Sequence, residues 1–315
     1  NFLRASNEQN NTPEIFYIGH AVPREIPMKG FTAFALCLLF LSLTGGCAMH
    51  REPVWKQAGL DRPTEHTDTL FAAARHCYAT VAGQAAVDNC IALHEAVLKD
   101  NPGHYQARVN AATLYILKGT AYTDSSSAKS DIFHRAMTYA ELAMYTNPGF
   151  KARVDAGQRP WEAASTLGAA EVEAMFFWVT ALQYEFKEGM SLPSKVVNID
   201  WLQHALVFLD RIETVAPEFG GGGVEFGKVI CYIALPESRG GSEAKGDEYM
   251  QKAIAKGGDW LLPRWARGKY YLPIKGKKQE AAADLAWVAA QNPAAYRDPY
   301  PWRIYFQDDA RQLQR

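Results

Sequence analysis

The sequence predicts an all-α fold in which pairs of helices stack as a degenerate α-solenoid and form a single compact domain over residues 70–315. Three observations support this prediction. Apolar residues recur with the 3.6-residue period of amphipathic helices, no alternating run is long enough to be a convincing strand, and near copies of one Asn-Pro stretch recur between the helices. Such a stack has a concave face or a central channel, and we expect a partner to bind there.

Residues 28–47 have the pattern of a bacterial lipoprotein signal. Lys29 supplies the positive start, residues 31–43 form an apolar run, and two glycines precede Cys47. The run fits the roughly 7 to 15 residues of a signal and is shorter than the about 20 needed to cross a bilayer. The pattern resembles a lipobox, although Leu43 stands four positions before the cysteine instead of three. It predicts a signal peptide at 28–46, cleavage before Cys47 and lipidation of the Cys47 sulfur. The alternative is a buried core helix.

The segments on either side of this signal complete the N-terminal organisation. Residues 1–27 are polar and have no period, which predicts a disordered or non-native segment upstream of a start at Met28. Lipoproteins kept at the inner membrane usually carry aspartate after the lipid cysteine, whereas this chain has Ala48. The resemblance therefore predicts the periplasmic face of the outer membrane, with the leaflet left open, and residues 47–69 become a linker from the lipid anchor.

Cys77 and Cys90 are placed to face each other across a helical hairpin. Residues 70–82 and 86–99 both have the helical period, and the two cysteines lie equally far from the break between these helices. In an oxidising periplasm this placement favours a disulfide, which would contribute about 3 kcal/mol by the chain-entropy argument. Two free buried thiols remain an alternative. A metal site that adds His76 or His94 is another, although only Cys90 and His94 have ligand-like spacing.

The Asn-Pro stretches mark the boundaries between helix pairs. Residues 101–109 and 147–154 are near copies, and residues 216–219 and 292–296 are weaker echoes. Proline just after a helix stops it, as in tetratricopeptide-like helix pairs. The spacings of 46, 69 and 76 residues between these prolines exceed the usual repeat of about 34. The repeats are therefore predicted to be degenerate and interrupted by extra helices.

Two helices between these breaks are strongly apolar. The helix predicted at 170–186 is apolar over most of its surface, and the helix predicted at 201–215 has Asp200 as its expected N-cap. Trp178, Tyr184 and Trp201 have larger rings than such a stripe needs. They are the candidate lining of a ligand channel, and the alternative is that they are ordinary core residues.

Composition and motifs give no support to catalysis or nucleic-acid binding. The net charge of -1 leaves no basic surface for nucleic acid, and aromatic residues make up 12% of the chain. Residues 222–228 have phosphate-loop spacing, but Val229 stands where a serine or threonine should hold magnesium. No nucleophile, base and orienting group can be combined. We therefore expect no enzyme activity, no cofactor and no resident metal.

From about residue 171 onward, the chain resembles the T-component family of the tripartite ATP-independent periplasmic (TRAP) transporters, also called TatT-like proteins. The stretches that carry the resemblance occur in order along the chain at 171–182, 205–219, 221–227, 234–242, 266–271 and 309–313. They include the Ala-aromatic-Trp helix, the glycine-rich turn and the Arg-Gly-Lys-Tyr-Tyr segment. Phe219 and Gly220 depart from the tyrosine or histidine that the family commonly has before its glycine pair.

The resemblance implies a periplasmic, lipid-anchored helical-repeat protein that assembles with itself. It would dock the solute-binding protein of a TRAP system and help to hand over a small, hydrophobic ligand, without a catalytic step. The main alternative is a generic tetratricopeptide scaffold lipoprotein of envelope assembly. The scaffold predicts an open, curved solenoid with a polar groove, and the transporter component predicts a more closed body with an aromatic-lined passage. A secreted enzyme is a third reading and would need titratable groups converging in a pocket.

Overall fold

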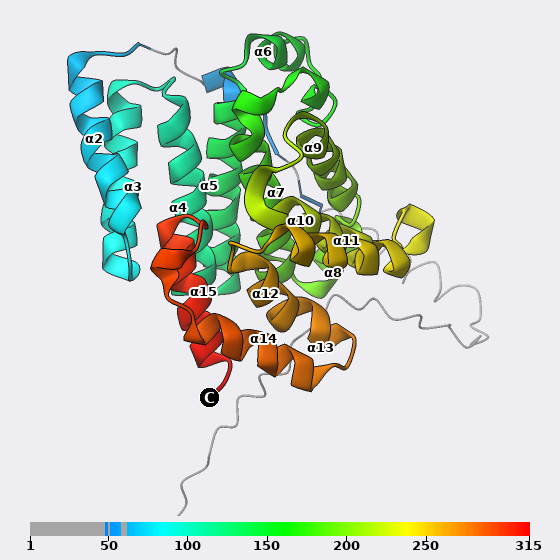
Figure 1. The fold of residues 1–315 in the computed structure, drawn as a ribbon. Helices are drawn as coiled ribbons and strands as arrows, with labels where there is room; N and C mark the ends of the chain where they lie inside the picture. The colour runs from blue at the N-terminus through cyan, green and yellow to red at the C-terminus, as the bar shows by residue number, and fades with distance from the viewer. Residues whose placement is uncertain (1–47, 50, 58–61) are drawn as a thin grey trace, which may run out of the picture.

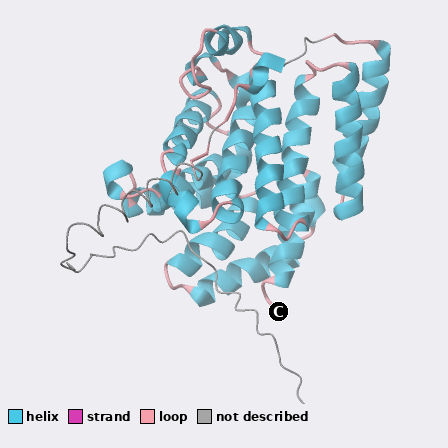
Figure 2. Ribbon diagram, turned by 180° about the vertical axis from the view of Figure 1, so that it is seen from behind, coloured by secondary structure: helices cyan, strands magenta, loops and turns pink. Residues whose placement is uncertain are grey.

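The computed structural model describes residues 48–49, 51–57 and 62–315, and every regular element in these ranges is helical (Figures 1 and 2). The longer helices are α2 (Glu65–Thr80), α3 (Gln84–Asp100), α4 (Tyr105–Tyr122), α5 (Ser126–Met144), α7 (Val172–Tyr184), α9 (Trp201–Val215), α10 (Gly223–Ala234), α11 (Glu243–Lys256), α14 (Lys278–Ala290) and α15 (Tyr300–Gln312). The shorter ones are α6 (Pro148–Asp155), α8 (Leu192–Val197), α12 (Leu262–Ala266) and α13 (Leu272–Ile274). The predicted signal peptide and Cys47 lie outside the described residues.

Short helical turns connect these helices. The 3₁₀ turns are η1 (Val54–Gln57), η2 (Ala164–Thr166), η3 (Ala169–Glu171), η5 (Phe219–Gly222), η6 (Glu237–Arg239) and η8 (Pro293–Ala295). Two turns are π-helical, η4 (Glu185–Gly189) directly after α7 and η7 (Arg267–Tyr271) directly after α12. The all-α prediction is confirmed for the described part of the chain.

The asparagines of the Asn-Pro repeats end or start helices. Asn147 is the N-cap of α6, and its side-chain oxygen accepts the Phe150 amide at 3.0 Å, with Pro148 at the first helical position. Asn101 is the C-cap of α3, and its side-chain oxygen accepts the amides of Arg62 and Gly103. The repeated motif therefore marks helix boundaries, as its sequence predicts.

The N-cap predicted for α9 differs in its chemistry. Helix α9 has the predicted bounds, and Asp200 occupies the N-cap position, but its side chain makes no capping hydrogen bond. Its carboxylate instead pairs with Arg239 of η6. The Asp200 carboxylate therefore forms an ion pair with a distant segment instead of the N-cap hydrogen bond that the local sequence predicts.

Consecutive helices pack side by side from α2 to α5, as the row of blue to green helices in Figure 1 shows. Helix α7 packs on α4 and α5. Helix α9 packs on α7, α10 packs on α9, and α11 packs on α10. The last helix, α15, returns to pack against α2 and α4. The last helix therefore packs on the first long helices of the described residues, and the single compact domain is confirmed while the predicted solenoid arrangement is not.

Helix α7 lies at the centre of the main apolar core. Met175, Trp178 and Leu182 have no exposed surface. The Trp178 indole N–H donates to Glu141 of α5 at 2.8 Å, and the Arg51 guanidinium holds the same carboxylate with two hydrogen bonds of 3.1 Å. The segment that follows the predicted lipid anchor is thereby fixed to the middle of the domain.

Candidate functional site: an aromatic-lined cavity

A cavity of about 770 Å³ lies between α7, α10 and the C-terminal helices α12 to α15. This volume is within the range of pockets that hold small organic ligands. Much of the wall is apolar and aromatic, and it includes Phe176, Phe226, Trp260, Trp265, Trp302 and Phe306. The site is thus shaped for a compound with a large apolar surface.

One face of α7 forms a long wall of the cavity. Glu173, Phe176, Thr180, Tyr184 and Lys187 all line it. Their spacings of three and four residues place them on one side of the helix, which continues into the π-helical turn η4. At about 1.5 Å per residue, this face spans roughly 21 Å from its acidic to its basic end.

The glycine-rich turn η5 brings α10 close to this wall. Gly220, Gly221 and Gly222 all have positive φ angles, a region that glycine adopts without strain. A Cβ atom on Gly221 would lie 2.2 Å from the Trp260 indole, and one on Gly223 would lie 3.0 Å from Phe176. The glycines that resemble a phosphate loop in sequence therefore serve close packing of aromatic side chains at the cavity.

Both π-helical turns contribute basic or hydroxyl side chains to the cavity. Turn η4 supplies Lys187, and η7 supplies Lys269 and Tyr270. The Lys187 ammonium lies 3.9 Å from the centre of the Tyr270 ring, and the Lys269 ammonium lies 5.4 Å from it. π-Helical turns often occur at functional sites because they displace side chains from the regular helical register.

Lys269 is fully paired in this arrangement. Its ammonium lies 2.7 Å from Asp309 of α15, and the other oxygen of Asp309 accepts the Trp265 indole N–H at 2.7 Å. Glu188 is engaged in a similar way, by the Lys129 ammonium at 2.6 Å and the Thr120 hydroxyl at 3.1 Å. Two carboxylates near the cavity are therefore already hydrogen-bonded to other groups.

Lys187 is less well compensated. Its ion pair in the described structure is with Glu188, at 3.7 Å. Burial lowers the pKa of Lys187 from 10.5 to about 8, which the charge of Glu188 counteracts and that of Lys269 reinforces. The side chain still has 27% of its surface accessible, because it faces the open volume of the cavity. At neutral pH it is a cation facing an apolar space.

Two further polar groups at the wall are not fully satisfied. The buried Trp302 indole N–H has no hydrogen-bond partner in the described part of the chain, and the buried Tyr270 hydroxyl has the Tyr184 hydroxyl beside it but makes no hydrogen bond of regular geometry. Burial raises the pKa of Tyr270 and of Tyr184, so both phenols keep their protons. Buried polar groups are normally hydrogen-bonded, so unpaired donors in a cavity wall are available to a ligand.

Of the aromatic residues predicted to line a channel, the structure brings Tyr184 to the cavity wall. Trp178 lies in the core on the other side of α7, against Phe208 and Glu141. Trp201 packs against Trp161 and Trp178 outside the cavity. Ring size alone does not show which side of a helix faces a cavity, so it does not distinguish the two tryptophans from Tyr184.

Sequence reasoning missed the basic residues of the site. Lys187 follows Tyr184 by three residues, so it extends the apolar face of α7, and a lysine in that position is a usable signal. Lys269 and Tyr270 lie in the Arg-Gly-Lys-Tyr-Tyr segment. This segment contributes to the family resemblance, but the sequence alone predicts no role for its residues. No local pattern places these two segments side by side.

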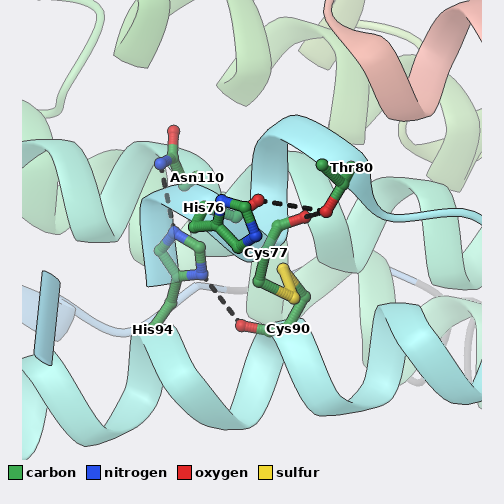
Figure 3. The surroundings of a disulfide bond; sticks show 6 residues. All are labelled: His76, Cys77, Thr80, Cys90, His94 and Asn110. Carbon is green, nitrogen blue, oxygen red and sulfur yellow. Dashed lines mark hydrogen bonds between the residues drawn. A yellow bond between two sulfur atoms is a disulfide. The ribbon is translucent and has the colours of Figure 1, made fainter. Parts of the chain in front are cut away.

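The predicted helical hairpin carries its cysteines where they can pair, and in the structure Cys77 and Cys90 form a disulfide with a Cα–Cα distance of 5.7 Å (Figure 3). His94 lies beside it, but both of its ring nitrogens are used: Nδ1 bonds the Cys90 carbonyl at 2.8 Å, and Nε2 bonds the Asn110 amide at 3.1 Å (Figure 3). Among the described residues no group of three or more His, Cys, Asp or Glu side chains is placed to hold a metal ion. This region is therefore structural in character.

The fold and the site together define an all-helical protein with an aromatic-lined cavity. The family model of the TRAP transporter T-component (TAtT) matches residues 81–298, and the chain belongs to this family. The match begins well before residue 171 and so includes much of the N-terminal half, with Cys90 inside it and Cys77 outside. A comparison with curated proteins finds no match. None of the helices in the described residues is long and apolar enough to cross a membrane.

Proposed function

We propose that this T-component is a lipid-anchored periplasmic protein that binds a small apolar ligand in the α7–α10 cavity and docks the solute-binding protein of its TRAP transporter. The observation that carries the ligand part is the 770 Å³ cavity with an aromatic wall. Family membership supports the association with a TRAP transporter. The protein would act by binding and transfer, without a catalytic step.

The closed arrangement of the helices favours this function over a scaffold of envelope assembly. A scaffold would present an open groove, whereas here α15 packs back onto α2 and α4. The cavity between α7, α10 and the C-terminal helices has a largely apolar wall and is better suited to a small molecule than to a peptide.

The anchor is proposed at Cys47, with the outer membrane as the site of attachment and a homo-oligomer as the assembled form. The Met49 amide donates to the Asn198 side chain at 2.5 Å, and Arg51 pairs with Glu141. Since these contacts begin two residues after Cys47, a lipid there would hold the domain close to the membrane surface. Metabolic labelling with a fatty-acid analogue, compared between the wild type and Cys47→Ser, tests the lipid.

The partner is tested by capture from periplasmic extract of the source organism. The bait is the mature chain with Cys47→Ser, and bound proteins and small molecules are identified by mass spectrometry. Recovery of an extracytoplasmic solute-binding protein supports the proposal. Recovery of envelope-assembly proteins without such a binder would reject it in favour of the scaffold.

A further inference from the structure

The charge balance at one end of the cavity leaves a positive charge in excess. Three ammonium groups lie there, those of Lys129, Lys187 and Lys269, against the carboxylates of Glu188 and Asp309. Lys129 and Lys269 each have a carboxylate oxygen within 2.7 Å, so the excess charge falls on Lys187. A buried charge without a close partner is costly and is retained where something compensates it.

The surroundings of Lys187 offer that compensation only in part. The Tyr270 ring covers one side of the ammonium at 3.9 Å, a favourable cation–π contact. The ammonium has three N–H donors, and the adjacent Tyr270 hydroxyl, which lies beside that of Tyr184, is a fourth donor that makes no hydrogen bond of regular geometry to the described residues. An acceptor that carries negative charge would satisfy both groups at once.

The rest of the cavity wall can contact the apolar part of a ligand whose charged end reaches Lys187. From Lys187, the α7 face continues through Tyr184, Thr180 and Phe176, and Phe226 and Ile230 of α10 line the same cavity. About 16 Å of helix separates Phe176 from Lys187 at the usual helical rise. An apolar chain or ring system can therefore lie along this wall while its end reaches the ammonium.

The acidic residues of the wall do not oppose this arrangement. Glu173 of α7 lies fourteen residues before Lys187 of η4, and it accepts a hydrogen bond from Gln106 at 3.1 Å. Asp298 accepts the backbone amides of Leu261 and Leu262 at 2.8 and 3.2 Å. Both carboxylates have protein donors of their own, so neither competes directly for Lys187.

From these contacts we infer that the cavity binds an amphiphilic anion, a carboxylate or phosphate on an apolar body, whose acidic group contacts the Lys187 ammonium and the Tyr270 hydroxyl. The inference rests on the proposed ligand-binding function and specifies the class of ligand. The anionic end lies between η4 and η7, and the apolar body lies against α7 and α10.

Binding of matched probes tests the inference. Decanoate and 1-decanol share one chain and differ in charge, and 4-phenylbutyrate and 4-phenylbutanol form an aromatic pair. Binding to the mature chain with Cys47→Ser is followed by calorimetry and by the fluorescence of tryptophans at the wall, such as Trp265. We expect the acid of a pair to bind at least ten-fold more tightly than its alcohol. Decyl phosphate then decides between the two acidic groups.

Variants at Lys187 identify the contact. Lys187→Met should bring the affinities for acid and alcohol within about two-fold of each other, and Lys187→Arg should keep the preference. Lys252→Met is the matched control, because Lys252 is 46% exposed and pairs with Glu248 on the surface of α11. It should bind both probes as the wild type does. Thermal unfolding confirms that each variant is folded.

The outcomes separate the inference from the function on which it depends. Equal binding of acid and alcohol by the wild type, or a preference that survives Lys187→Met, overturns the anion inference and leaves a cavity for neutral ligands. Absence of binding by all probes overturns the inference and also removes the ligand part of the proposed function. Capture of a solute-binding protein is independent of both results.

Discussion

The ion pair that fixes the N-terminal segment gives the sharpest test of how the domain is held together. Arg51 and Glu141 are both buried, with 9% and 3% of their side-chain surfaces exposed, and they are ninety residues apart in sequence. Replacing Arg51 by methionine keeps most of the side-chain volume but leaves Glu141 with the Trp178 indole as its remaining side-chain donor in the described structure. Breaking one partner of a buried pair costs about 3–5 kcal/mol.

We therefore expect Arg51→Met to lower the free energy of unfolding by about 3–5 kcal/mol, measured by urea unfolding of the mature chain followed by circular dichroism. Arg153→Met is the matched control, because Arg153 is exposed and should change stability by no more than about 0.5 kcal/mol. The double variant Arg51→Met with Glu141→Met should lose less than the sum of the two single variants, since it leaves no unpaired charge. Strict additivity, or a loss below 1 kcal/mol for Arg51→Met, would refute the reasoning.

Two further predictions concern the hairpin and the glycine turn. Replacing Cys77 and Cys90 by serine should lower the free energy of unfolding by about 3 kcal/mol, because the disulfide closes a loop with a sequence separation of 13 residues. In urea unfolding, a reductant should destabilise the wild type by a similar amount and should leave the double variant unchanged. Gly221→Ala should lower the free energy of unfolding by more than 2 kcal/mol and alter the near-ultraviolet dichroism of the tryptophans, because it adds strain at φ +50° and displaces Trp260. The matched control is Gly220→Ala, which also has positive φ but open space around its Cβ and should cost only about 1–2 kcal/mol; equal losses for the two would contradict the packing argument.

Helix content and helix boundaries follow from local patterns that the sequence displays. Helix α9 has the predicted bounds because its apolar period is regular, and Asn147 caps α6 because its capping chemistry is local. The pairing of Cys77 with Cys90 needs only the geometry of one hairpin. These features involve residues close together in the chain, so one sequence is enough to place them.

The cavity could not be predicted in the same way. Lys187 of η4 and Tyr270 of η7 are about eighty residues apart in sequence, and no periodicity predicts their contact. The direction of Trp178 is decided by Glu141 on α5, and the return of α15 to α2 closes the domain. These are long-range choices, and they determine which of several aromatic rings face the cavity.

The free protein should be destabilised by the residue that we assign to ligand binding. Folding lowers the pKa of Lys187 from 10.5 to about 8, so the folded state disfavours the charged form. Since one pKa unit corresponds to about 1.4 kcal/mol, the penalty below pH 8 is at most about 3 kcal/mol. It is fully present at neutral pH and is relieved as the pH rises from 8 to 10.5, where the unfolded chain binds more protons than the folded one.

Lys187→Met should therefore be more stable than the wild type at pH 7, by up to about 3 kcal/mol, and this advantage should shrink towards pH 10. Urea unfolding of both proteins at the two pH values measures it, and Lys252→Met, at an exposed lysine, should show no such pH-dependent gain. A variant less stable than the wild type at pH 7 would mean that Glu188 and Tyr270 already compensate the charge. A more stable variant that also loses the preference for acids would show that Lys187 is retained for binding at a cost in stability, as expected where local folding rules are broken at a functional site.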